Sequence, residues 1–211
     1  MAVKVAIIYY SATGTTYVLA RAIEEGAKAA GAEVRFRKVH ELAPEEAIKS
    51  NQGWAAHSIE TQDVEEATND DLKWADAVIF GTPTRYGLPT AQIKQFIDGT
   101  GGLWASGALV NKVCSSFTSS GTSHGGQETT IVNLNITFYH WGAIIVGPGY
   151  ADPIQFQSGN PYGASFTSNN GALKPDETAL AAARFQGRRV AELAARFLAV
   201  AEPDAEKDGE S

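Results

Sequence analysis

The chain has 211 residues and a formal net charge of −7, and 44% of its residues are hydrophobic. This composition supports one folded domain with a core and excludes a chain that is disordered throughout. Its apolar runs are shorter than the roughly 20 residues of a membrane-spanning helix. The acidic balance argues against a nucleic-acid surface, which needs clustered lysine and arginine. The single cysteine, Cys114, excludes an internal disulfide and a multi-cysteine metal site.

The two ends of the sequence predict a cytoplasmic protein with an acidic tail. Residues 1–10 lack the basic region and small-residue cleavage site of a secretory signal, so we expect a cytoplasmic location. Residues 201–211 hold five acidic residues against one lysine, which predicts a frayed tail after a folded domain over residues 1–200. No histidine has partners at the spacing of a metal site, so no bound metal is expected.

The first third of the chain alternates between strand and helix patterns. Residues 3–10 form an apolar run typical of a strand buried on both faces. Residues 13–30 carry an apolar stripe at helical spacing. Residues 33–39 alternate charged and apolar side chains, as a strand near a sheet edge does. Residues 44–71 are polar and poorly periodic, with room for one short helix.

The same alternation continues to the end of the domain and predicts the fold class. Further strands are expected over residues 75–81, 109–116 and 143–147, and helices over residues 90–98, 127–139 and 176–200. Strands that alternate with helices predict a doubly wound α/β fold with a parallel sheet and right-handed crossovers. We expect about five strands in the order 2-1-3-4-5, with an inserted loop region before the last helix. Ligands of such sheets bind beyond the carboxyl ends of the strands.

The loop after the first strand has the parts of an anion cradle. Residues 11–16 (SATGTT) supply four hydroxyls, one glycine and the backbone N–H groups of a helix N-terminus. The segment contains no lysine or arginine, and neither the triphosphate-binding pattern ending in Gly-Lys-Ser/Thr nor the dinucleotide fingerprint is present. A simple serine or threonine N-cap is the alternative reading. The strand–loop–helix context favours a site for one phosphate group.

Two later loops carry unusual side chains at the same predicted edge of the sheet. Residues 81–87 (GTPTRYG) place Arg85 and Tyr86 after a buried strand, between a proline that keeps the chain extended and a glycine that allows a sharp return. Residues 118–128 open another helix, and Gly121 lets the backbone wrap a planar ring. Residues 101–107 present Trp104 on a glycine-rich loop.

These motifs together resemble one protein family. The pattern of residues 11–16 resembles the flavodoxin phosphate loop, which holds flavin mononucleotide (FMN). GTPTRYG, TGGLWASGAL, the SSGT…GGQE run and PYGAS resemble the WrbA family, which are flavodoxin-like NAD(P)H:quinone oxidoreductases first described as tryptophan-repressor-binding proteins. The resemblance runs from the first strand to about residue 197. It implies a flavodoxin-like fold and FMN as cofactor.

The resemblance also implies site residues. Tyr10 would meet the nicotinamide dinucleotide, and Trp104 would pack beside the quinone. Some relatives carry a bulky residue and a histidine where this chain has Thr13 and Thr15, and residues 119–127 are one residue longer here, with His124 as the extra group. The implied FMN contacts are Ser11, Ala12, Thr13, Gly14, Thr15, Thr16, Thr84, Arg85, Tyr86, Thr118, Ser119, Ser120, Gly121, Thr122, Ser123 and His140.

The implied activity is a two-electron reduction of quinones to hydroquinones. NADH or NADPH would deliver hydride to the flavin, which would pass it to the quinone with ping-pong kinetics. No side-chain acid or base is required, and Arg85 is a candidate for an electrostatic role. The family forms tetramers, so we expect a homotetramer with an ordered interface formed by the insertion near residues 148–175. The alternative function is a flavodoxin-type single-electron carrier without turnover of its own. A transcriptional accessory role is disfavoured by the acidic body.

Overall fold

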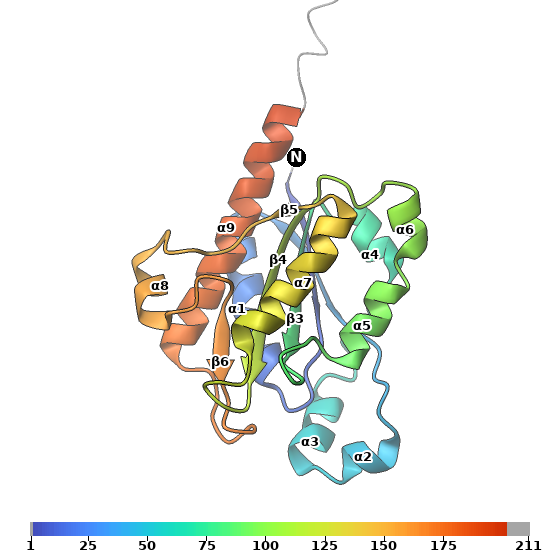
Figure 1. Cartoon of the computed structure of the whole chain (residues 1–211), viewed down its shortest axis with the longest axis vertical. Coiled ribbons are helices and arrows are strands. Elements are labelled where there is room, and N and C mark those ends of the chain that lie inside the picture. Colours follow the sequence, from blue (N-terminus) through green and yellow to red (C-terminus); the bar gives the residue numbers. More distant parts are fainter. Residues whose placement is uncertain (1, 202–211) are drawn as a thin grey trace, which may run out of the picture.

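The computed structural model describes residues 2–201, which form one parallel sheet with helices on both of its faces (Figure 1). The strand order is β2-β1-β3-β4-β5, and β6 also pairs with β4. This confirms the predicted doubly wound class and order. The strands are β1 (Lys4–Tyr9), β2 (Glu33–Lys38), β3 (Ala77–Pro83), β4 (Val113–Ser120), β5 (Ile144–Ile145) and β6 (Ser165–Thr167).

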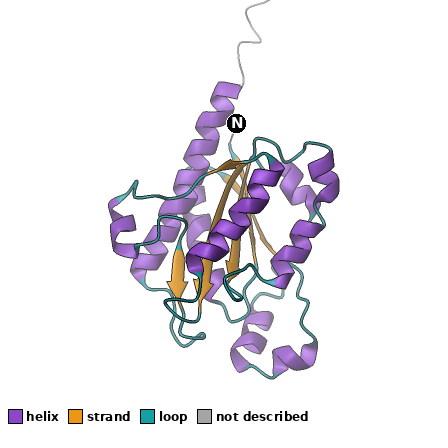
Figure 2. Cartoon of the chain, viewed as in Figure 1, coloured by secondary structure: helices purple, strands orange, loops and turns teal. Residues whose placement is uncertain are grey.

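The helices cover the sheet in two layers, as Figure 2 shows in purple. Helices α1 and α9 pack with the core on one face, and α4, α5, α6 and α7 with the core on the other. The helices are α1 (Thr15–Ala29), α2 (Glu45–Lys49), α3 (Gln52–Glu60), α4 (Asn69–Trp74), α5 (Ala91–Asp98), α6 (Gly101–Ala105), α7 (Gln127–Trp141), α8 (Pro153–Ser158) and α9 (Glu177–Ala201). Within residues 2–201, none of the helices combines the length and apolarity that a bilayer crossing requires.

Strand β1 explains why its sequence is apolar throughout. Ile7 and Tyr9 face the core under α1 and α9, whereas Ile8 and Tyr10 face the core on the other side. Successive side chains of a strand point to opposite faces, so a central strand covered on both sides needs no polar position. Among the described strands, β2 pairs only with β1, and it is half-buried, which confirms the predicted edge strand; a single bridge joins its last residue, Lys38, to Glu66.

Several expected boundaries were wrong. Residues 44–71 contain α2, α3 and the start of α4 rather than one short helix, and the loop around Trp104 is the helix α6. Strand β4 begins at Val113 rather than residue 109, because Asn111 adopts a left-handed backbone (φ 63°) that no strand continues. It ends at Ser120, so Thr118, Ser119 and Ser120 belong to the strand and not to the loop after it.

The insertion interrupts the last position of the sheet. Strand β5 pairs with Val113 and Cys114 of β4, and β6 pairs with Thr118 to Ser120 of the same strand. The two short strands therefore occupy one edge position, and residues 146–164 leave the sheet between them. The sequence did not predict β6. The acidic tail predicted for residues 201–211 lies outside the described residues, apart from Ala201 at the end of α9.

Candidate functional site

A cleft of about 250 Å³ opens beyond the carboxyl ends of the strands. Figure 1 shows these strand ends at the lower edge of the sheet. The cleft lies between the loop after β1, the ends of β3 and β4, and the loop after β6. The lining residues are Ser11, Ala12, Thr13, Thr15, Thr16, Asn51, Pro83, Thr84, Arg85, Ser119, Ser120, Gly121, Ser168, Asn170 and Gly171. The cleft is therefore lined by most of the FMN contacts that the sequence predicted within residues 11–16 and 84–121.

The first loop leaves the start of α1 open. The N-cap of this helix is Gly14, whose backbone is left-handed (φ 93°), and no side chain caps the helix. The Ser11 hydroxyl accepts from the Gly14 N–H at 3.1 Å instead. The hydroxyls of residues 11–16 therefore do not serve as the N-cap of α1. No described side chain pairs with the N–H groups of the first turn, and these groups and the helix dipole favour an anion in front of them.

Polar groups that carry no formal charge dominate the cleft. The Thr16 and Ser119 hydroxyls pair at 2.9 Å and join the first loop to the end of β4. Among the described residues that line the cleft, Arg85 is the only lysine or arginine. Neutral hydroxyls and amides suit a phosphate ester, which they can hold by several hydrogen bonds at once. The residues present therefore fit the phosphate end of FMN.

The loop after β3 is a tight two-residue turn. Arg85 and Leu88 exchange both backbone hydrogen bonds, and Tyr86 and Gly87 between them are left-handed (φ 54° and 80°). Such a turn favours asparagine and glycine, so a bulky residue at its tip is strained. The Tyr86 side chain is fully exposed. Strain of this kind is concentrated at functional sites, where it fixes the direction of a side chain.

The loop after β4 matches the sequence prediction only in part. Ser119, Ser120 and Gly121 line the cleft, but Thr118 is fully buried and donates to the Thr82 carbonyl at 2.7 Å. Thr122 and Ser123 lie in the exposed turn beyond Gly121 and do not line the cleft. The Gln127 amide supports this end of the strand by donating to the Ser120 hydroxyl at 2.7 Å.

Trp104 and His140 lie together but away from the cleft. The Trp104 indole N–H donates to the His140 carbonyl at 3.0 Å. Both residues precede the starts of strands, on α6 and at the end of α7, at the opposite edge of the sheet (Figure 1). His140 lies 13 positions after the cleft-side Gln127 on α7, a rise of about 20 Å. Neither Trp104 nor His140 is among the residues that line the cleft.

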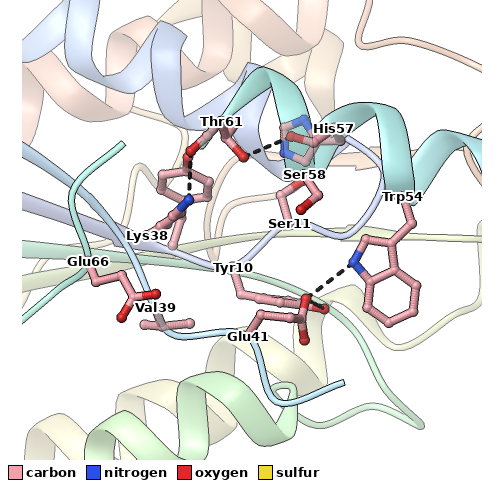
Figure 3. A pocket seen from close by; sticks show the side chains of 11 residues that line it. Tyr10, Ser11, Lys38, Val39, Glu41, Trp54, His57, Ser58, Thr61 and Glu66 are labelled. Carbon is pink, nitrogen blue, oxygen red and sulfur yellow. Dashed lines mark hydrogen bonds between the residues drawn. The ribbon is translucent and has the colours of Figure 1, made fainter. Parts of the chain in front are cut away.

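Tyr10 lines a second, smaller cavity of about 80 Å³ beside the first loop (Figure 3). Its side chain is 4% exposed, and its hydroxyl donates to Glu41 at 2.8 Å. The same carboxylate accepts from the Trp54 indole at 3.2 Å. Three further donors reach it from α5 and the backbone: Gln92 at 2.7 Å, the Leu42 N–H at 2.9 Å and the Ala43 N–H at 3.0 Å.

Glu41 is therefore a hub that sequence reasoning missed. Burial raises the pKa of its carboxyl, but hydrogen bonds from the Ala43 amide, Gln92, Tyr10 and Trp54 outweigh burial and hold the pKa below its usual range. The surrounding sequence offered no signal, because the donors come from β1, α3 and α5 and meet only in the fold. On the other face of the sheet, the buried Tyr9 hydroxyl has no hydrogen-bond partner among the described residues, and burial raises its pKa.

Residues from the insertion complete the cleft and were also missed. The turn after β6 forms the wall of the cleft with three residues, Ser168, Asn170 and Gly171. The run Asn169-Asn170-Gly171 is a recognisable turn signal, because asparagine and glycine tolerate left-handed backbone. Nothing in the sequence shows that this turn folds back over the first loop.

Comparisons with known proteins show which family the chain is similar to. Residues 3–156 match the family described as NADPH-dependent FMN reductase. The chain is 49% identical to an NAD(P)H dehydrogenase (quinone) of Deinococcus radiodurans over 93% of this chain and 98% of that protein. It is 48% identical to a protein of the same name from Sinorhizobium fredii, over 92% and 98% of the two chains. A flavodoxin, WrbA-like protein from Agrobacterium tumefaciens has a similar structure, with a TM-score of 0.66, 26% identity and 92% and 99% coverage.

Proposed function

The chain belongs to the NADPH-dependent FMN reductase family, and on that premise we propose that it is an FMN-dependent NAD(P)H dehydrogenase that reduces quinones. The observation that carries this proposal is the cleft itself. It joins an uncapped helix N-terminus to hydroxyls from two strand ends, which suits the phosphate of FMN. Two relatives at 48% and 49% identity are named NAD(P)H dehydrogenase (quinone), and these names support a quinone and NAD(P)H as the two substrates.

The first loop would hold the cofactor by its phosphate. N–H groups at the start of α1 and the hydroxyls of Thr13, Thr15 and Thr16 would bind the phosphate oxygens, and Thr84, Ser119 and Gly121 would flank the rest of the molecule. When bound, FMN supplies two-electron chemistry between the nicotinamide and the quinone. The other implied contacts, Ser11, Ala12, Tyr86, Thr118, Ser120, Thr122, Ser123 and His140, remain part of this proposal.

The protein's own contribution is position and electrostatics. Arg85 stands at the mouth of the cleft, where its charge would favour the more negative, reduced cofactor. The exposed Tyr86 ring offers an apolar surface for a flat substrate. Protons for the hydroquinone oxygens would come from water, since the described residues that line the cleft include no aspartate, glutamate or histidine. Tyr10 would act on the nicotinamide side through the neighbouring cavity.

A homotetramer completes this proposal. Because Trp104 and His140 lie far from the cleft of their own chain, they would serve the site of a neighbouring copy, with Trp104 beside the quinone and His140 beside FMN. Exposed aromatic side chains on the insertion, Tyr150, Phe156 and Tyr162, support an interface there. A cytoplasmic location accompanies the proposal, since one cysteine suits a reducing compartment. The net charge of −7 supports the further proposal that the protein binds no nucleic acid.

A titration tests the activity directly. Purified protein reconstituted with FMN is expected to oxidise NADH or NADPH under anaerobic conditions and to form one hydroquinone per nicotinamide consumed when benzoquinone is supplied. Flavin bound with no oxidation of either nicotinamide would identify the single-electron carrier instead. Protein that binds no FMN would overturn both functions.

The variant Thr16→Val tests the site. It removes one cleft hydroxyl and is expected to weaken FMN binding about tenfold, as the loss of a hydrogen bond to a charged group does. Thr100→Val is the matched control, because it removes an equally buried hydroxyl that donates to the Ile97 carbonyl outside the cleft. FMN affinity, measured by fluorescence quenching, should be unchanged in the control. Equal losses in both variants would contradict the assignment.

A further inference from the structure

The loop after β6 is fixed to the end of β4. The Ser168 N–H and hydroxyl both donate to the Ser120 carbonyl, at 2.8 and 3.1 Å. Ser168 also holds the turn that follows, since its hydroxyl accepts from the Gly171 N–H at 3.2 Å and its carbonyl from the Leu173 N–H at 2.8 Å. Ser168 is itself buried. The turn therefore has a defined place relative to the cleft.

The backbone of this turn is strained at two positions in succession. Asn169 and Asn170 are both left-handed (φ 47° and 55°), and Gly171 follows with φ 89°. Asparagine tolerates this conformation better than most residues but still at an energetic cost. The bonds from Ser168 compensate for that cost. The conformation turns the Asn170 side chain toward the cleft and leaves Asn169 outside the cleft lining.

The Asn170 side chain lies at the wall of the cleft against Gly121. A Cβ atom added to Gly121 would collide with the Asn170 side-chain oxygen. On its other side the turn adjoins the first loop, because a Cβ atom on Gly171 would lie 3.3 Å from the Thr13 hydroxyl. Within residues 2–201, neither the backbone N–H nor the side-chain amide of Asn170 has a hydrogen-bond partner. The cleft thus contains an unused donor beside the anion-binding loop.

We propose that the Asn170 carboxamide donates a hydrogen bond to the phosphate group held by the first loop and so closes the phosphate site from the insertion side. The inference rests on the proposed function, which identifies that phosphate as part of FMN. It adds a phosphate-binding residue that the sequence motifs did not indicate. It also gives the insertion a direct part in cofactor affinity.

Two glycine variants test the proposal. Asn170→Gly removes the donor, and Asn169→Gly is a matched control that removes a neighbouring carboxamide outside the cleft lining. Both relieve left-handed strain, so both proteins should fold and should melt at or above the wild-type temperature. Affinities for FMN and for riboflavin, which lacks the phosphate, are measured by flavin fluorescence. Asn170→Gly should weaken FMN binding about tenfold or more, leave riboflavin binding within about twofold, and thus shrink the preference for FMN, whereas Asn169→Gly should change neither.

The outcomes separate this inference from the function on which it rests. Wild-type protein that fails to bind FMN would remove the proposed function and this inference together. Wild-type protein that binds FMN, with Asn170→Gly binding it equally well, would overturn the inference alone. Equal weakening for FMN and riboflavin would also overturn it, because the contact would then involve a group other than the phosphate. Asn170→Asp should weaken FMN further than Asn170→Gly, because a carboxylate repels the phosphate.

Discussion

At the scale of single residues, Glu41 joins parts of the chain that are far apart in sequence. Its carboxylate accepts from Tyr10 at the end of β1, from Trp54 on α3 and from Gln92 on α5 (Figure 3 shows the first two). Tyr10 directly precedes the anion-binding loop. Hydrogen bonds to a charged group contribute more than neutral ones, so the ionised carboxylate stabilises the edge of the cleft on which the loop depends.

Glu41→Gln should destabilise the protein and reduce its pH dependence. The folded-state pKa of Glu41 is lowered, so its contribution is present at neutral pH and is lost as the pH falls through that pKa. The variant should lower the free energy of unfolding by about 1–3 kcal/mol at neutral pH, because glutamine cannot accept all the donors. Urea unfolding at about pH 7 and about pH 4 measures both effects. If the free energy of unfolding fell by the same amount in the wild type and in the variant between these two pH values, the result would contradict the proposed role of the Glu41 carboxylate.

The same scale explains which site residues could be predicted from sequence. The hydroxyls of residues 11–16 were predictable because strand, loop and helix are consecutive, and local order alone places them at the cleft. Asn170 and Glu41 were not, because their positions depend on how distant segments pack. Thr118 differs from Ser119 and Ser120 for a physical reason: its hydroxyl donates to the Thr82 carbonyl inside the sheet, and it does not line the cleft.

At the scale of elements, α1 and α9 approach each other closely at two glycines. A Cβ atom on Gly26 would overlap the Arg184 backbone, and one on Gly187 would overlap the Ile23 backbone. Each helix thus places a glycine where the other's backbone passes. The close contact lets alanines such as Ala183 and Ala191 complete the core beneath both helices.

Substituting one of these glycines should separate the two helices. Gly187→Ala should lower the free energy of unfolding by about 1–3 kcal/mol, as overpacking does. Gly102→Ala is the control: this glycine lies inside α6 with no atom within 4 Å of an added Cβ, so alanine should stabilise the helix by up to about 1 kcal/mol. Urea denaturation should therefore show a lower free energy of unfolding for Gly187→Ala and a higher one for Gly102→Ala. Destabilisation of similar size in both would show that backbone contact is not the cause.

Elements were predictable where periodicity and burial agree, as in β1, α1 and α9. Strand β4 was shifted because its second half, with Thr118, Ser119 and Ser120, looks polar although every one of these side chains is buried. Their hydroxyls are satisfied by partners in other segments, such as the Thr82 carbonyl for Thr118 at 2.7 Å. Strand β6 was missed because three residues are too few for a periodic signal and its pairing partner lies 47 residues earlier in register.

At the scale of the whole molecule, exposed apolar side chains support the proposed tetramer. On α7, Val132, Ile136 and Tyr139 share one exposed face beside Trp104. A stripe of this kind at helical spacing is typical of a face that another surface covers.

Ile136→Glu should dissociate the tetramer. A buried carboxylate without a partner is costly at an interface, so native mass spectrometry should show smaller species, and quinone turnover should fall about tenfold or more because Trp104 no longer reaches a neighbouring cleft. Ile59→Glu, on α3, changes another exposed isoleucine and should leave assembly and turnover intact. FMN retained by an active, fully monomeric Ile136→Glu protein would contradict the shared site.

Because the edge position of the sheet is shared by β5 and β6, the strand order does not depend on how many residues connect these two strands. β5 ends opposite Cys114 and β6 resumes opposite Thr118, so only the stretch of β4 between them, residues 115–117, spans the gap. An extended linker of about 10 Å would bridge it. The strand order therefore does not depend on the length of residues 146–164, and β6 returns the chain to the sheet at the point from which its next turn reaches the cleft.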